Sequence, residues 1–131
     1  MKTAAIIWGV VFLLLGFLGM MPGVAPNGML FGIFRVDGMQ NAIHLLTGIF
    51  ALFAGLSSPH ASRVYFETVG VIYALLAFLG FFYGSRNLMG LMAHNMADTW
   101  LHAVIAVVSL YLGYVWRKGA FQVQSVPTGR M

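Results

Sequence analysis

Four long apolar segments joined by short polar links make up most of this chain of 131 residues. They cover roughly residues 3–20, 38–57, 64–83 and 97–116. Each has about the 20 residues that an α-helix needs to cross the hydrocarbon core of a bilayer. Only 8% of all residues are charged, whereas about a quarter are charged in an ordinary soluble domain. We therefore predict an all-α membrane protein with four transmembrane helices.

The basic residues predict the orientation of these helices. The net charge is +4, but the seven basic residues are scattered rather than gathered in a stripe, which argues against a nucleic-acid partner. Five of them lie on the side of the two termini and the middle link, and two lie on the other side. Since short cytoplasmic loops carry the excess of Lys and Arg, both termini are expected in the cytoplasm. The links 21–37 and 84–95 then face outward.

An internal repeat relates the two halves of the chain. Residues 9–19 overlie residues 70–80 at an offset of 61, and the second segment overlies the fourth at an offset of 58. Repeat one covers about 3–57 and repeat two about 64–116. Two tandem helical hairpins that point the same way predict a pseudo-two-fold, up-down-up-down bundle. Residues 1–118 form the transmembrane domain in this interpretation, and 119–131 a flexible cytoplasmic tail.

Polar side chains stand at the start of the second and fourth segments, where a bilayer makes them rare. Asp37 and Asn95 have the form of helix N-caps, with Gln40 a suitable capping-box partner and Asp98 a shorter substitute. Each histidine follows its cap by seven residues, so the two should lie below the headgroups at one depth. The bundle should bring them face to face across its axis. The predicted polar cluster comprises Asp37, Gln40, Asn41, His44, Asn95, Asp98, Thr99 and His102.

Several roles are open to the two histidines at this stage. Buried polar groups are usually just hydrogen-bonded, so a structural cluster that fixes the packing of the bundle is one role. Axial ligation of a b-type haem by His44 and His102 is another, with Gly48 and Ala106 leaving room one turn below each ring. A titrating pair used in proton or small-molecule passage is a third. A metal site is not predicted, because Gln40 stands where the second repeat has Asp98. No catalytic residue is assigned.

The remaining polar and loop residues give weaker signals. His60 and His94 are expected to be solvated, and Arg63 and Glu67 to form an ion pair at the start of the third helix. The link 21–38 contains the run Met29-Leu30-Phe31-Gly32-Ile33-Phe34, which is too apolar to stand free in water. We expect it to fold onto the outer face or to dip into the membrane interface, and to offer a docking surface to a membrane-protein partner.

Three motifs resemble a bacterial family of small four-helix membrane proteins classed as a domain of unknown function. They are Asn41-x-x-His44-Leu45-x-x-Gly48, the aromatic and glycine run of residues 70–80, and Asn95-x-x-Asp98-x-x-Leu101-His102. The resemblance covers roughly residues 5–116. It implies this architecture and the bacterial inner membrane, and it brings no activity. The sequence favours a non-enzymatic accessory subunit or binding helper of a membrane complex, with haem-binding electron transfer as the alternative.

Overall fold

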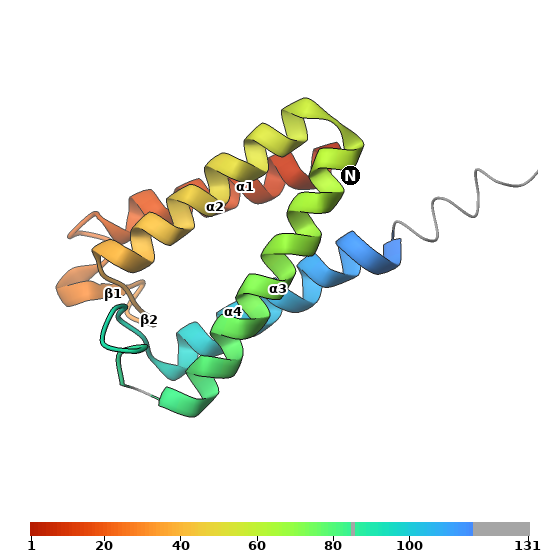
Figure 1. Cartoon of the computed structure of the whole chain (residues 1–131). Helices are drawn as coiled ribbons and strands as arrows, with labels where there is room; N and C mark the ends of the chain where they lie inside the picture. The colour runs from red at the N-terminus through yellow and green to blue at the C-terminus, as the bar shows by residue number, and fades with distance from the viewer. Residues whose placement is uncertain (85, 117–131) are drawn as a thin grey trace, which may run out of the picture.

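The computed structural model describes residues 1–84 and 86–116 and contains four long helices within them (Figure 1). They are α1 (Lys2–Gly19), α2 (Gly38–Ser57), α3 (Pro59–Tyr83) and α4 (Met96–Leu110), and a π-helical turn, η2 (Tyr111–Trp116), continues α4. All four are long and apolar enough to cross a membrane. The predicted all-α membrane fold is therefore confirmed. The predicted tail 119–131 lies outside the described residues.

The four helices pack as two hairpins. α1 lies along α2 and α3 along α4, whereas α2 and α3 meet mainly near their shared link and diverge away from it (Figure 1). Ser58 begins α3 as an N-cap whose side chain accepts a hydrogen bond from the Ala61 backbone amide at 3.0 Å. Pro59 follows at the first helical position, where its fixed φ and missing N–H do no harm. Ser58 alone therefore links α2 to α3 in a tight turn.

Glycine lets the helices of each hairpin approach closely. A Cβ on Gly9 would lie 2.7 Å from the Leu52 side chain, and a Cβ on Gly70 would lie 2.7 Å from that of Leu110. The same residue pair, one glycine and one leucine, thus joins α1 to α2 and α3 to α4. Close backbone approach is the main source of helix association in lipid, where apolar side chains gain little from leaving the solvent.

Two loops close one end of the bundle, which we call the loop end. The first contains η1 (Pro26–Gly28) and a short antiparallel hairpin of β1 (Met29–Leu30) and β2 (Phe34–Arg35), paired Leu30 to Phe34. In the second loop, Leu88 forms an isolated antiparallel bridge with Met92. Leu30 belongs to a small buried cluster that packs against Leu15 and Leu18 of α1, and Leu88 is also buried.

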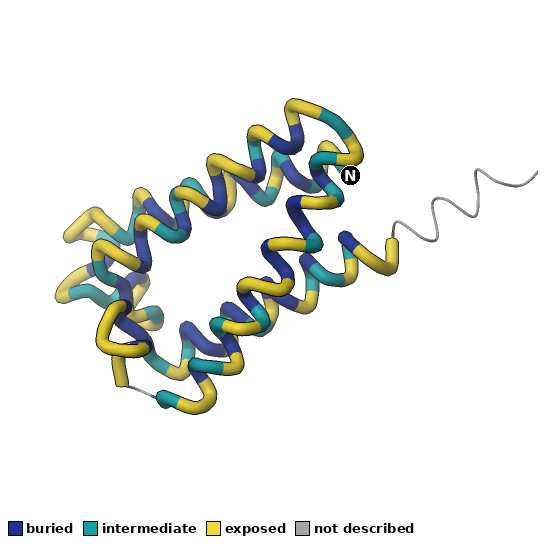
Figure 2. The backbone as a smooth tube through the Cα atoms, in the orientation of Figure 1, coloured by how far each residue is buried: buried dark blue, intermediate teal, exposed yellow. Residues whose placement is uncertain are grey.

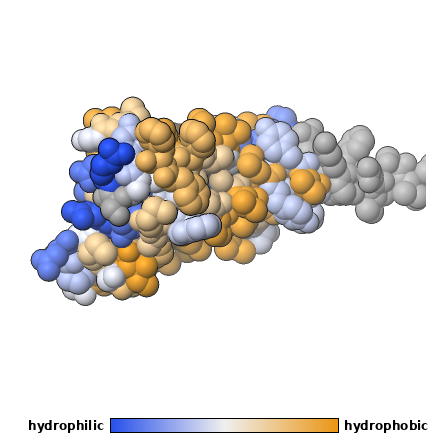
Figure 3. All heavy atoms as spheres, turned by 90° about the horizontal axis from the view of Figure 1, so that it is seen from below, coloured by the Kyte–Doolittle hydropathy of each residue, from blue (hydrophilic) through white to orange (hydrophobic). Residues whose placement is uncertain are grey.

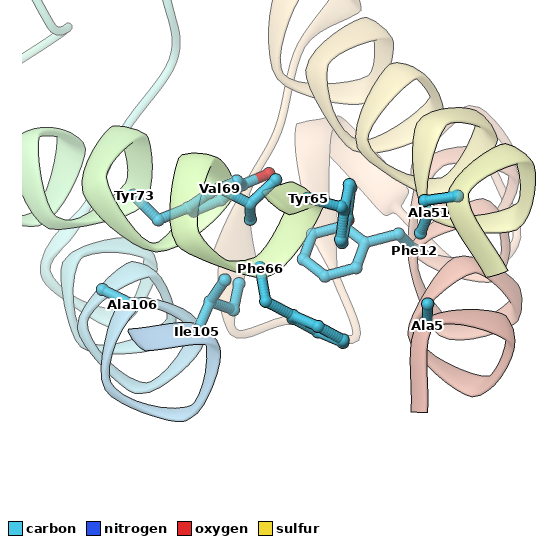
Figure 4. Close-up of a cluster of buried hydrophobic side chains, with 10 residues drawn as sticks. Ala5, Phe12, Ala51, Tyr65, Phe66, Val69, Tyr73, Ile105 and Ala106 are labelled. Atoms are coloured by element: carbon cyan, nitrogen blue, oxygen red, sulfur yellow. The ribbon is translucent and has the colours of Figure 1, made fainter. Parts of the chain in front are cut away.

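The burial pattern is that of a protein surrounded by lipid. Buried residues follow the inward stripes of the helices and exposed residues the outward ones (Figure 2). Many of the exposed residues are large and apolar. In the space-filling view the body is largely hydrophobic and the hydrophilic atoms gather at the loop end (Figure 3). The buried cluster shown in Figure 4 runs between the hairpins and includes Phe12 of α1, Tyr65, Phe66 and Tyr73 of α3, and Ile105 of α4.

Candidate functional site

Four buried rings, one from each helix, meet in the centre of the bundle. We call Phe12, His44, Tyr73 and His102 the ring quartet. The ring centroids are 5.7 Å apart for Phe12 and His44, 6.4 Å for His44 and His102, 5.4 Å for His102 and Tyr73, and 5.8 Å for Tyr73 and Phe12. Each contact is edge to face, the favoured arrangement of aromatic pairs. The structure thus brings the two histidines into contact where the two hairpins meet.

The packing of the ring quartet decides whether a haem would fit between His44 and His102. A haem held by His44 and His102 would lie between the two imidazoles and extend over both flanks of the pair. Phe12 and Tyr73 occupy those flanks, both 1% exposed and in ring contact with the histidines. The packing of these residues does not fit a haem.

Gly48, expected to leave room for a cofactor below the His44 ring, instead allows close contact between α1 and α2. A Cβ on Gly48 would lie 2.9 Å from the Gly9 carbonyl oxygen and 2.9 Å from the Leu13 backbone nitrogen. Gly48 therefore faces α1, and its lack of a side chain lets the two helix backbones approach. The expectation that Gly48 makes space for a cofactor is wrong. Ala106 is buried in the hydrophobic core.

Both predicted N-caps are formed, but the capping box is found at the start of α4 and not at the start of α2. The Asp37 side chain accepts a hydrogen bond from the Gln40 backbone amide at 2.9 Å, and the Asn95 side chain accepts one from the Asp98 amide at 2.9 Å. The reciprocal bond exists only for Asp98, whose Oδ2 accepts from the Asn95 amide at 3.0 Å. The Gln40 side-chain amide makes no such bond to the Asp37 backbone, since neither of its polar atoms has a hydrogen-bond partner among the described residues. The expectation that Gln40 completes a box is therefore wrong.

The same carboxylates tie the two hairpins together at the loop end. Asp37 Oδ2 accepts a hydrogen bond from the Ala93 amide of the second loop at 2.8 Å. Asp98 Oδ2 accepts one from the Arg35 amide of the first loop at 3.2 Å. The Asn95 side-chain amide donates to the Ile33 carbonyl at 2.9 Å. Each carboxylate therefore accepts one hydrogen bond at the start of its own helix and one from the loop of the other hairpin.

His94 belongs to the buried cluster, although the sequence suggested a solvated loop residue. It is 0% exposed, and its Nε2 lies 2.5 Å from Thr99 Oγ1. A Cβ on Gly80 would lie 2.6 Å from the same Nε2, so the glycine of α3 makes space for the imidazole. Burial lowers the pKa of His94, an effect partly opposed by the nearby Gly84 backbone. His60, in contrast, is exposed as predicted, and the predicted Arg63–Glu67 ion pair is present at 3.9 Å.

The interior of the cluster holds many polar atoms without a protein partner. Six of the eight predicted residues are buried, and Asp37 and Asn95 are half-buried. Within the described ranges, no hydrogen-bond partner is found for either ring nitrogen of His44 and His102, for the Gln40 side-chain amide, or for Asp98 Oδ1. Among the same residues, no three His, Asp or Glu side chains converge at metal-binding distances. Buried polar atoms of this kind commonly bind ordered water.

The quartet also contains two residues that the sequence analysis did not single out. Phe12 and Tyr73 overlie one another at the offset of 61 that relates the first and third segments, just as His44 and His102 overlie one another at 58. An aromatic residue at matching positions of both repeats was the available signal. It went unused because aromatic residues are common in apolar helices.

Four membrane-length helices with a buried polar cluster at one end define a small multi-pass integral membrane protein. Residues 2–115 match the family described as a domain of unknown function, DUF4383, and the chain belongs to that family. Neither curated proteins nor solved structures gave a match to the chain.

Proposed function

We propose that this chain is a non-enzymatic accessory subunit or binding helper of a membrane complex, with its loop end on the outer side of a bacterial inner membrane. Its termini then lie in the cytoplasm, in keeping with the distribution of basic residues. The buried His44/His102 cluster serves to hold the two hairpins in register. The partner is a membrane protein that contacts the loop end.

The supporting observation is the conformation of the two loop tips. Phe31 and Met89 both have positive φ angles, 55° and 51°, and each precedes a glycine that also has a positive φ. Hydrogen bonds close each turn, from the Ile33 amide to the Leu30 carbonyl at 3.0 Å and from the Leu91 amide to the Leu88 carbonyl at 2.9 Å. Two successive residues at positive φ form a type I′ turn, which favours Asn-Gly or Gly-Gly over a bulky first residue.

The two tips therefore keep a large apolar side chain where the backbone disfavours one. A strained residue of this kind costs on the order of 1–3 kcal/mol. Neither side chain recovers that cost by burial, since Phe31 is 54% and Met89 59% exposed. Ile33 and Leu91, two positions further along, are also exposed. A partner surface that covers these four side chains would explain why both loops hold them in place.

The test compares Phe31→Asn and Met89→Asn with a matched control, Asn27→Gly. Asn27 also has a positive φ, 53°, so its replacement changes the same kind of backbone position without removing an apolar side chain. The tagged chain is expressed in its own host, the membranes are solubilised in a mild detergent, and the size of the assembly is measured. The wild type and Asn27→Gly should migrate in an assembly much larger than the chain's 14.3 kDa.

The two tip variants should remain folded and migrate as the free chain in its detergent micelle. Their stability should be unchanged or raised, because asparagine tolerates positive φ better than phenylalanine or methionine. The proposal fails if the wild type migrates as the free chain, or if both tip variants stay in the assembly.

A further inference from the structure

A lateral groove separates α2 from α3 on the membrane-facing surface. Its volume is about 520 Å³, and it begins near the link between the two helices, beside Phe53 and Val64. It ends beside Thr47 and Tyr73, near the middle of the two helices, and beside Ile43, about one turn further toward the loop end. The walls are almost entirely apolar side chains. We infer that this groove binds one acyl chain of a membrane phospholipid from the leaflet on the side of the termini.

The length of the groove fits one leaflet. Thr47 lies ten residues from Ser57, where α2 ends at the link, which at 1.5 Å per residue is about 15 Å. The hydrocarbon core of a bilayer is about 30 Å thick, so one leaflet contributes about 15 Å. A chain that enters beside the α2–α3 link would therefore reach Thr47 and Tyr73 with its methyl end.

The hydroxyl groups of Thr47, Tyr65 and Tyr73 in the groove are hydrogen-bonded within the protein. The Thr47 hydroxyl donates to the Ile43 carbonyl at 2.7 Å, which leaves the Tyr73 hydroxyl to donate to Thr47 Oγ1 at 3.0 Å. The Tyr65 hydroxyl donates to the Thr47 carbonyl at 2.9 Å. Because these groups satisfy one another, the deep end of the groove suits a hydrocarbon better than a polar headgroup.

A transmembrane helix from a second copy or from another protein fits the groove poorly. Helix contacts in membranes favour small residues that let backbones approach. The groove is instead bordered by large exposed side chains, among them Phe53 and Val64. A slender flexible chain can pass between such side chains where a helix cannot.

The experiment maps the chain by photolabelling of the full-length protein in phosphatidylcholine nanodiscs. A fraction of the lipid carries a diazirine near the methyl end of one acyl chain, and a parallel sample carries it near the glycerol. Adducts are located by mass spectrometry. The methyl-end probe should label the region of Ile43, Thr47 and Tyr73, and the glycerol-end probe the region of Phe53 and Val64.

Groove labelling should exceed labelling of the exposed α4 residues Val104 and Val107 about tenfold, a preference of about 1.4 kcal/mol. Thr68→Trp places a bulky ring in the groove from an exposed position and should abolish the preference. Val107→Trp adds the same ring outside the groove and should leave it unchanged. Equal labelling of all lipid-facing residues by the wild type would overturn the inference. So would a stable dimer, seen by native mass spectrometry, whose interface shields the groove from both probes.

Discussion

Replacing a histidine of the ring quartet with phenylalanine should stabilise the protein. His102 is fully buried, and both of its ring nitrogens lack a hydrogen-bond partner among the described residues. Leaving a buried polar group unsatisfied costs about 1–3 kcal/mol. Phenylalanine keeps the ring and its edge-to-face contacts with His44 and Tyr73 while it removes the two polar atoms. We therefore expect His102→Phe to raise the free energy of unfolding by about 1–3 kcal/mol.

Leucine at position 102 separates the cost of the unpartnered ring nitrogens from the stabilisation by the aromatic contacts. It also removes the polar nitrogens, but it loses two aromatic contacts worth about 0.5–1.5 kcal/mol each. The gain and the loss nearly cancel, so His102→Leu should leave the stability within about 1 kcal/mol of the wild type. The double variant His44→Phe, His102→Phe should gain more than either single variant, because it removes the unpartnered ring nitrogens of both histidines.

The free energy of unfolding is measured by titrating SDS into dodecyl maltoside micelles and following helicity by circular dichroism. Trp100→Phe, at a lipid-exposed position, is the control for a change of aromatic residue and should have little effect. A loss of stability in His102→Phe would refute the reasoning. It would mean that the imidazole nitrogens hold a water network or another bound group whose contribution exceeds the cost of burying them.

Three further predictions follow from the packing and the loops. The purified protein should be colourless, with no Soret or α band in an oxidised-minus-reduced absorption spectrum, because Phe12 and Tyr73 fill the space that a haem would need. Gly9→Ala should destabilise the protein by about 1–3 kcal/mol in the SDS titration, because the new Cβ would overlap α2. Gly38→Ala is its control: a Cβ there meets nothing within 4 Å in the described part of the chain, so stability should hold or rise slightly. Because burial lowers the pKa of His94, the folded state binds its proton less readily than the unfolded state, and stability should fall as the pH drops below about 6.5. His94→Gln should show a smaller loss between pH 7.5 and pH 5.5 than the wild type, and an equal loss would contradict the assignment.

The extent of agreement between sequence and structure differs between local and long-range features. The four helices, their approximate bounds and the caps Asp37 and Asn95 were predictable, because each depends on residues close in the chain. The matching positions of His44 and His102, each seven residues after the cap of its helix, followed from the same local spacing. The long-range partners of Asp37 and Asp98 did not, since the Ala93 and Arg35 amides reach these carboxylates from loops of the opposite hairpin.

The sequence by itself determined that this is a four-helix membrane protein with a polar head on the second and fourth helices, because hydrophobic length and capping are local properties. Only the tertiary structure decided which polar groups are buried together. It placed His94 inside beside Gly80 and Thr99, and it turned Gly48 toward α1. Such features depend on how the hairpins meet, since burial is a property of the surroundings of a residue and not of its type. The groove between α2 and α3 has the same origin, because it exists only where two helices diverge.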